Sequence, residues 1–275
     1  MNEIIKADWL AEDIREIWIT NRLIARNFKA GQFLVIRHGE RGERIPLTIV
    51  EADTDRVRII IQDVGYSTGI LCGLEKGDVI ESVIGPLGLP SEIEQYGKVV
   101  CLAGGIGAAP LKPVALALKT AGCKLTIIEG VRSEKYIIMQ DELGEIADQF
   151  ILMSDDGSIG KKGLVTEPLK KMISDGDIPD LVFAVGPPVM MQAAAAITRE
   201  HSIPLTVSLN PVMVDGTGMC GCCRVEVGDK TKFACVDGPE FNGNEVNFEL
   251  LIHRLRAYKK EEAIKTGKHH TGCGC

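Results

Sequence analysis

Apolar and polar residues alternate in short segments along the N-terminal third of the chain. Ile14–Thr20 and Phe33–Arg37 show this alternation, and Val57–Ile61 is a compact β-branched run. Glycine-containing turns separate the segments at intervals of about ten residues, which is the spacing of strands in small antiparallel barrels. The pattern predicts an all-β barrel over residues 1–96, ending in a polar connector that starts at Pro90.

The pattern changes at Lys98, where continuous apolar runs replace the alternation. Such runs are typical of strands that are buried on both faces, as in parallel sheets covered by helices. The predicted strands are 99–103, 124–128, 150–153, 181–185 and 204–208, and the predicted helices are 111–120, 165–174 and 189–199. Strands that alternate with helices predict a parallel α/β domain over residues 97–210.

The last part of the chain departs from both patterns. Residues 211–245 are rich in glycine and cysteine, which predicts an irregular loop around a metal site. Residues 246–275 are assigned to a C-terminal helix and tail, with the helix predicted over Val246–Thr266 from its spaced leucines. The predicted fold class is therefore a β barrel followed by an α/β domain and a small metal-binding appendage.

Composition and charge narrow the function classes. The 275 residues carry a net charge of −7, which is the wrong sign for general binding to nucleic-acid phosphates. No apolar run approaches the roughly 18 residues that a membrane span requires, and the first residues lack the basic start of a signal peptide. A cytoplasmic protein without nucleic-acid or membrane partners is expected. In that compartment, nine cysteines favour metal or redox chemistry over disulfides.

Part of the cysteine-rich segment has the spacing of an iron–sulfur site. Plant-type [2Fe–2S] proteins arrange their ligands as C-x4-C-x2-C with a distant fourth cysteine. Cys220, Cys223 and Cys235 fill the last three places, and Asp215 stands in the first. Zinc also accepts three thiolates and a carboxylate, so the spacing leaves both metals open. Cys222 could replace Cys220 or Cys223 as a ligand, but two adjacent thiolates rarely converge on one iron. It is therefore interpreted as a residue that packs near the site or contacts its ligands.

A glycine-rich turn follows the first predicted parallel strand. It contains Gly104, Gly105 and Gly107, and Pro110 lies in the first turn of the helix behind it. Glycine lets the backbone approach a pyrophosphate, and the N–H groups at a helix start favour anions. Proline suits this position because its missing donor costs nothing there. The spacing is not Gly-x-Gly-x-x-Gly, and tight strand-to-helix connections also use glycine, so the turn alone is compatible with either role.

A second turn, at Gly186 and Pro187, follows the fourth buried run. Open α/β sheets bind ligands at the carboxyl ends of their strands, so two such turns favour a nucleotide site at that edge. Together they resemble the ferredoxin–NADP reductase family, in which a flavin-binding barrel precedes a nicotinamide-binding domain. The resemblance implies a dinucleotide pyrophosphate over the first turn and the nicotinamide near the second. Val185 stands where many members of the family have cysteine.

The resemblance also implies FAD-binding residues in the barrel. The family has an Arg-x-aromatic-Ser/Thr motif, and this chain has Arg44, Pro46, Leu47 and Thr48 as an Arg-x-Pro-Leu-Thr variant. Thr48 takes the place whose hydroxyl reaches flavin N5, and Leu47 takes the aromatic place. Hydroxyl and N–H groups suit the flavin diphosphate, and the corresponding loop of this chain contains Gly65, Ser67 and Thr68.

Within this family, the motif variant and the cysteine segment are similar to electron-transfer subunits of dihydroorotate dehydrogenase and its relatives. Aspartate in the first ligand place is similar to the small subunits of bifurcating NADH-dependent reduced ferredoxin:NADP oxidoreductases. The resemblance implies FAD, a [2Fe–2S] cluster and NAD(H) as cofactors. It also implies a larger flavoprotein partner that has [4Fe–4S] clusters and binds NADP(H) and ferredoxin. Because hydride would pass directly between nicotinamide and flavin, no side chain is assigned as an acid or base.

Two other functions stay open. The electron-transfer subunit of an NAD-dependent dihydroorotate dehydrogenase would use the same cofactors with another partner, although a fourth cysteine ligand is expected there in place of Asp215. A zinc-stabilised binding module with an empty nucleotide fold is the alternative outside the enzymes. A visible spectrum separates the two classes, because flavin and iron–sulfur groups are coloured and zinc is not.

The choice between NAD and NADP also stays open. Glu129 is interpreted as closing the second parallel strand, where a carboxylate could hold a ribose hydroxyl of NAD. Arg132 and Ser133 follow it and could serve a 2′-phosphate instead. Polar chain ends are usually mobile, and this one carries the metal-capable residues His269, His270, Cys273 and Cys275.

Overall fold

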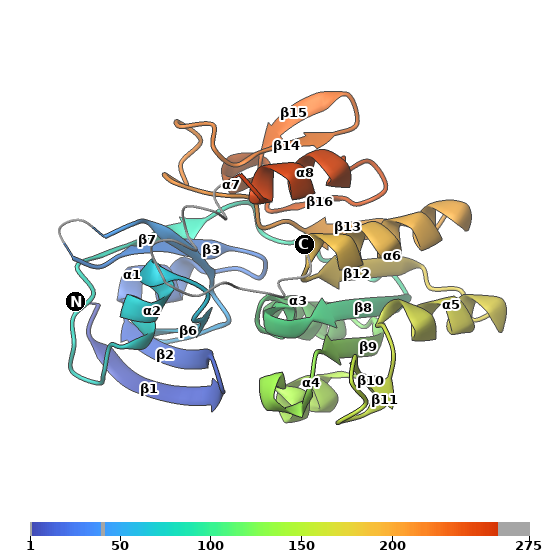
Figure 1. The fold of residues 1–275 in the computed structure, drawn as a ribbon, viewed down its shortest axis with the longest axis horizontal. Coiled ribbons are helices and arrows are strands. Elements are labelled where there is room, and N and C mark those ends of the chain that lie inside the picture. Colours follow the sequence, from blue (N-terminus) through green and yellow to red (C-terminus); the bar gives the residue numbers. More distant parts are fainter. Residues whose placement is uncertain (1, 40–41, 258–275) are drawn as a thin grey trace.

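The computed structural model describes residues 2–39 and 42–257, which form a barrel, an α/β domain and a smaller C-terminal unit (Figure 1). The barrel strands are β1 (Ile4–Ala11), β2 (Ile14–Thr20), β3 (Phe33–Arg37), β4 (Ile45–Thr48), β5 (Glu51–Asp53), β6 (Arg56–Gln62) and β7 (Ser82–Leu87). They form two antiparallel sheets, with the orders β1-β2-β6-β5 and β4-β3-β7.

Alternation along the barrel strands directs isoleucine and leucine side chains into a shared core. Ile17 in β2, Leu34 and Ile36 in β3 and Ile59 in β6 are all fully buried in one cluster. The barrel also contains two short helices that the sequence pattern did not predict, α1 (Arg22–Asn27) and α2 (Tyr66–Cys72).

A seven-stranded sheet forms the second domain, in the order β11-β10-β9-β8-β12-β13-β16. Its strands are β8 (Lys98–Gly104), β9 (Lys124–Val131), β10 (Gln149–Ser154), β11 (Lys161–Lys162), β12 (Leu181–Val185), β13 (Leu205–Ser208) and β16 (Glu240–Asn242). All neighbours are parallel except β13 and β16, which pair antiparallel. The predicted parallel α/β domain is therefore confirmed, with β16 added at its edge.

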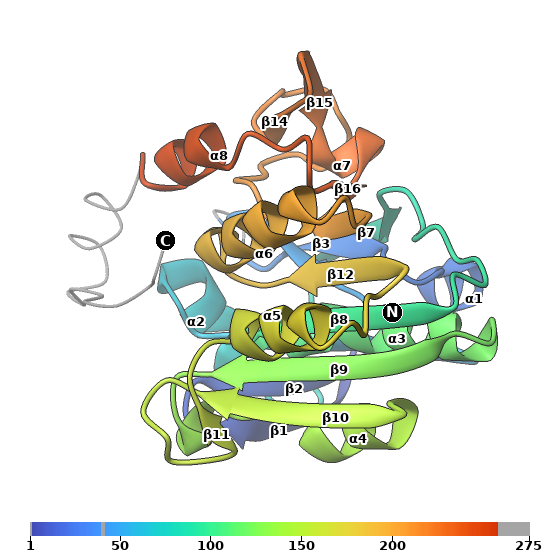
Figure 2. The same ribbon diagram turned by 90° about the vertical axis from the view of Figure 1, so that its right-hand side faces the viewer.

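Helices cover both faces of this sheet (Figure 2). α3 (Ala108–Thr120) and α4 (Gln140–Ile146) share one apolar cluster with Cys101 and Ile127. α5 (Thr166–Ser174) and α6 (Pro188–Glu200) share another with Leu102 and Ile128. Short 3₁₀ turns, η1 (Gly105–Gly107) and η2 (Glu134–Tyr136), follow β8 and β9. Every helix in the described residues is too short or too polar to cross a bilayer.

The C-terminal unit is more regular than the sequence predicted. Residues 211–245 were expected to be an irregular loop, but β14 (Arg224–Val227) and β15 (Lys230–Phe233) form a hairpin, and α7 (Ala234–Asp237) follows. α8 (Phe248–Leu255) confirms the start of the predicted C-terminal helix. The rest of that prediction, and the tail from His269 to Cys275, fall in residues 258–275, outside the described part.

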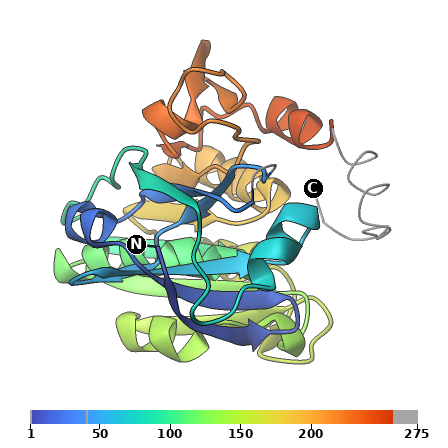
Figure 3. The same ribbon diagram turned by 90° about the vertical axis from the view of Figure 1, so that its left-hand side faces the viewer.

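The barrel packs against the α3 side of the sheet, and the C-terminal unit adjoins both (Figures 1 and 3). Ile14, Val50 and Ile60 of the barrel belong to the same apolar cluster as α3. Phe33 and Val35 belong to the cluster that contains the buried cysteines of the C-terminal unit. The barrel is thus packed against both other parts through its own side chains.

Candidate functional site

The two predicted nucleotide turns contact each other. β8 and β12 are neighbours in the sheet, with Ala103 opposite Val185, so both turns leave the same edge. Gly186 has φ +150°, and a Cβ there would lie 2.9 Å from Gly104 Cα. A Cβ at Gly104 would lie 2.6 Å from Pro187 Cδ. Only glycine fits at these two positions, which explains the two turns in packing terms.

The first turn leads into a helix whose start suits an anion. No described side chain caps the first turn of α3, which contains Pro110 and follows Gly107 directly. The first N–H groups of a helix lack acceptors within the helix, and they attract phosphate oxygens. Gly105 has φ +53°, and a Cβ there would meet nothing within 4 Å. The space beside Gly105 is therefore open.

Glu129 does not close its strand, contrary to the sequence interpretation. β9 continues to Val131, and Glu129 lies fully buried opposite Ala103. Neither carboxylate oxygen has a hydrogen-bond partner among the described residues, and burial raises the pKa of this group to about 8. In this arrangement a ribose hydroxyl has no access to Glu129. Arg132, which is exposed, and Ser133 follow the end of β9.

The predicted FAD motif lies on β4, beside β3. Thr48 is opposite Phe33 and Pro46 is opposite Val35. Leu47 instead packs against the barrel core, so its side chain points to the other face of the sheet. Arg44 precedes the strand and is exposed. Thr48 therefore shares a face of the sheet with Phe33, and Leu47, which takes the aromatic place of the motif, does not.

The predicted loop for the flavin diphosphate is the start of α2. Gly65 precedes this helix, and the Thr68 hydroxyl accepts the Gly65 N–H at 2.9 Å and the Val64 N–H at 3.1 Å. The Ser67 hydroxyl donates to Glu43. Both hydroxyls have protein partners, so the groups left for a phosphate are the N–H groups of the first helical turn.

Two of the predicted metal ligands are buried together. The Sγ atoms of Cys223 and Cys235 lie 3.1 Å apart, and both residues are free cysteines. Burial and the neighbouring Cys223 thiol raise the pKa of Cys235 well above its usual value. Two buried thiols without a disulfide suit a metal, because coordination deprotonates thiols that would otherwise stay neutral.

The other two predicted ligands lie in the glycine-rich loop before them. Cys220 is exposed, and hydrogen bonds from the backbone N–H groups of Cys222 and Asp215 lower the pKa of its thiol. The Asp215 carboxylate accepts a hydrogen bond from the Thr217 hydroxyl. No group of three metal-capable side chains converges in the described residues, so the set of four ligands stays a prediction. The donor types themselves fit an iron–sulfur site.

The predicted cluster loop packs directly on the barrel. Gly216 has φ +81°, and a Cβ there would lie 2.9 Å from Val35 Cγ2 and 3.3 Å from Leu87 Cδ1. Val35 is opposite Pro46 of the predicted FAD motif. The residue that follows Asp215 is therefore one strand away from β4. Sequence reasoning missed this contact, because nothing in the spacing pairs residue 216 with residue 35.

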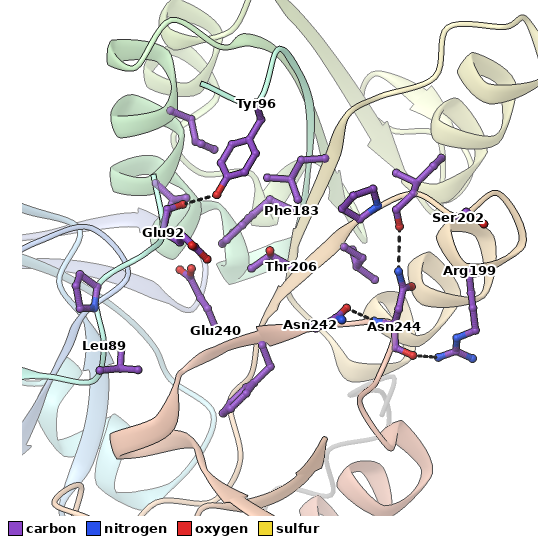
Figure 4. Close-up of a pocket in the computed structure, with 18 residues that line it drawn as sticks. Leu89, Glu92, Tyr96, Phe183, Arg199, Ser202, Thr206, Glu240, Asn242 and Asn244 are labelled. Carbon is purple, nitrogen blue, oxygen red and sulfur yellow. Dashed lines mark hydrogen bonds between the residues drawn. The ribbon is translucent and has the colours of Figure 1, made fainter. Parts of the chain in front are cut away.

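A cavity of about 720 Å³ lies elsewhere, beneath the connector between barrel and sheet (Figure 4). Its polar groups are hydrogen-bonded: Tyr96 donates to the Glu92 carbonyl, Arg199 donates to the Asn244 carbonyl, and Glu240 accepts from Ser91, just outside the cavity, at 2.6 Å. Burial raises the pKa of Glu240 to about 7. None of the predicted cofactor residues lines this cavity, so it is not the site that the motifs indicate.

Two family models match the chain. The oxidoreductase NAD-binding domain matches residues 101–196, which include both nucleotide turns. The iron–sulfur cluster binding domain of dihydroorotate dehydrogenase B matches residues 210–247, which include Asp215 and the three predicted cysteine ligands.

Relatives match along nearly the whole chain. A Thermotoga maritima protein described as a homologue of the dihydroorotate dehydrogenase B (NAD(+)) electron transfer subunit is 47% identical, covering 96% of this chain and 94% of its own. The Clostridium perfringens electron transfer subunit of that enzyme is 33% identical, covering 80% and 87%. Among solved structures, a chain of the NADH-dependent reduced ferredoxin-NADP oxidoreductase, a structure that concerns flavin-based electron bifurcation, is similar. It is 46% identical, the match covers 96% of both chains, and the TM-score is 0.91.

Proposed function

The chain belongs to the family of dihydroorotate dehydrogenase B-type electron-transfer subunits, which have a ferredoxin–NADP reductase-like fold, and we propose that it passes electrons between NAD(H) and a partner subunit. The observation that carries this proposal is the packing of the predicted cluster loop on the strand beside the FAD motif. The flavin site, where hydride is exchanged, and the cluster, which takes single electrons, would then lie on either side of one layer of side chains.

The α/β domain would bind the dinucleotide. The N–H groups at the start of α3 would receive the pyrophosphate over Gly105 and Gly107, and the close contact of Gly104 with Gly186 would shape the nicotinamide end. Because Glu129 is buried, discrimination between NAD and NADP would fall to Arg132 and Ser133. Exposed Arg132 could pair with a 2′-phosphate without losing an existing buried contact.

The barrel and the C-terminal unit would bind the redox groups. Thr48 would present its hydroxyl to the flavin, and the first turn of α2 would face the diphosphate. Asp215, Cys220, Cys223 and Cys235 would hold the cluster. FAD held there would supply hydride exchange with a nicotinamide and single-electron exchange with a [2Fe–2S] cluster. The protein's contribution is distance and orientation, so no acid or base is needed.

Spectroscopy of the anaerobically purified chain tests this proposal. Flavin absorbance and iron with sulfide in equal amounts are expected, and NADH should bleach the flavin and produce the EPR signal of a reduced cluster. Cys223→Ser should abolish the cluster signal and leave flavin bleaching by NADH in place, because the two groups have separate ligands. A colourless protein that contains zinc would overturn the proposal.

The partner would be a larger flavoprotein with [4Fe–4S] clusters that binds NADP(H) and ferredoxin, in a flavin-based bifurcating oxidoreductase. The similarity of 46% identity over 96% of the chain supports this choice, and so does aspartate in the first ligand place. The second candidate is a dihydroorotate dehydrogenase, which is favoured by the names of other relatives. Anaerobic co-purification followed by assays with NADP plus ferredoxin, and separately with dihydroorotate, distinguishes the two.

A further inference from the structure

Four charged side chains join the barrel to the α/β domain, and we call them the interdomain clamp. Glu51 (β5) and Arg58 (β6) belong to the barrel, and Lys112 (α3) and Glu142 (α4) belong to the α/β domain. Arg58 Nη1 and Nη2 lie 2.7 and 2.9 Å from the two oxygens of Glu142. Lys112 Nζ lies 2.7 Å from Glu142 Oε2 and also pairs with Glu51.

The cations of the clamp are largely removed from solvent. The side chain of Arg58 is 7% exposed and that of Lys112 is 13% exposed. Glu16, on β2, pairs with Arg58 from the barrel side and is itself buried. Bidentate pairing of a guanidinium with a carboxylate fixes orientation as well as distance, and burial weakens screening by salt. These contacts therefore constrain the domains more than exposed ion pairs would.

The clamp also lies within a few residues of both predicted cofactor-binding segments, the FAD motif and the pyrophosphate turn. Glu51 follows Thr48 by three residues, and the intervening Val50 is buried in the apolar cluster that contains α3. Lys112 lies in the helix that begins directly after Gly107 of the dinucleotide turn. The Glu51–Lys112 pair consequently ties the end of the FAD strand to the first turns of the nucleotide helix.

We propose that Glu51, Arg58, Lys112 and Glu142 are positioning residues for hydride transfer, because they hold the start of α3 in a fixed place relative to the end of β4. This inference rests on the proposed function. The clamp residues would touch neither hydride donor nor acceptor. They would act on the distance between the two, and a misplacement of about 1 Å can lower a rate by up to about a hundredfold.

Substituting Lys112→Met tests the proposal, because it removes the charge and keeps most of the apolar stem. Lys119→Met is the matched control, since Lys119 lies on the same helix and pairs at 2.6 Å with Asp148 inside the α/β domain. Lys112→Arg should restore the function, because it retains the positive charge. The measurement is anaerobic rapid mixing of the cofactor-loaded chain with NADH, following flavin absorbance over a range of NADH concentrations.

We expect Lys112→Met to lower the limiting rate of flavin reduction roughly tenfold and to change the half-saturating NADH concentration less than about twofold. Lys119→Met and Lys112→Arg should stay within about twofold of the wild type in both. An unchanged limiting rate in Lys112→Met would overturn the inference, and so would a loss that appears only in NADH affinity or thermal stability. If Lys112→Met folds poorly, Glu51→Gln takes its place and should show the same fall in the limiting rate.

The same experiment separates this inference from the function on which it rests. If neither NADH nor NADPH reduces the wild-type flavin, the proposed function is wrong. Hydrogen exchange then still reports on the clamp, because Lys112→Met should speed exchange in β5 and at the start of α4 and leave β12 unchanged. If Lys112→Met and the wild type exchange at the same rate in all three elements, the clamp does not fix the domains.

Discussion

Asp215 is the least usual donor in the predicted ligand set, and its carboxylate already accepts a hydrogen bond from Thr217. A carboxylate is a harder donor than a thiolate, and ligand type helps to set the potential of an iron–sulfur cluster. We expect Asp215→Cys to shift the midpoint potential of the cluster, measured by redox titration with EPR detection. Cys222→Ser is the control and should leave the midpoint in place, since Cys222 is not a predicted ligand. Equal midpoints in Asp215→Cys and the wild type would remove Asp215 from the ligand set.

Glu129 is a second residue whose environment has a measurable consequence. Its pKa is raised from 4.5 to about 8 by burial, so the folded protein holds this proton more tightly than the unfolded chain does. The contribution of Glu129 to the free energy of unfolding is fully present below about pH 4.5. It falls by about 1.4 kcal/mol per pH unit as the pH rises toward 8. Glu129→Gln should remove that decline.

The measurement is the free energy of unfolding, obtained from urea titrations between pH 5 and pH 8 without nicotinamide nucleotides. The wild type should lose on the order of 4 kcal/mol over this range relative to the variant. Parallel pH profiles of the two proteins would mean that folding does not raise the pKa of Glu129.

At the scale of elements, buried runs and alternating strands were predictable because their patterns are local. The runs at 99–103 and 181–185 correspond to β8 and β12, and the alternation at 14–20 corresponds to β2. Helix α2 was missed because its sequence reads as a turn; Thr68 caps its start, and it buries only Leu71 and Cys72. The β14–β15 hairpin was missed because its strands are short and only Val225 is fully buried there.

The contact between the two nucleotide turns gives a prediction for this edge of the sheet. Gly186→Ala would place a Cβ 2.9 Å from Gly104 Cα, where no flexible side chain can yield, and at a φ that alanine rarely adopts. The turns should separate, and affinity for NADH should fall at least about tenfold while flavin content stays constant. Calorimetric titration with NADH checks this.

Gly144→Ala provides the control for that substitution. Gly144 lies inside α4, and a Cβ there would meet nothing within 4 Å. Alanine in a helix interior is favoured over glycine, so affinity should be unchanged and stability slightly higher. If Gly186→Ala binds NADH as tightly as Gly144→Ala does, the two turns do not shape the nucleotide site.

At the scale of the whole molecule, the sequence motifs identified the parts but not the contacts between them. Packing of Gly216 on Val35 and pairing of Arg58 with Glu142 join residues that are far apart in the chain. No periodicity encodes such contacts, because they depend on how finished elements pack. Resemblance to a family implied the order of the units. The contact of the cluster loop with β3, the strand beside the FAD motif, is visible only in the structure.

The predicted cluster segment also exposes apolar residues to solvent. Met219, next to Cys220, is 89% exposed, and Val214 and Val236 are also exposed. A subunit that receives electrons must approach the cluster, and apolar side chains at that place suit burial by a partner. We therefore expect Met219→Asp to weaken assembly with the partner subunit roughly tenfold or more, because a buried unpaired carboxylate is costly.

Analytical anaerobic co-purification checks this, with NADH-dependent bleaching of the flavin as a measure of intact internal function. Ile178→Asp is the control, since Ile178 is similarly apolar and exposed but precedes β12, at the opposite end of that strand from Gly186. Bleaching should persist in both variants, and only Met219→Asp should lose its partner. If Met219→Asp retains the partner as well as Ile178→Asp does, electrons leave the chain by another face.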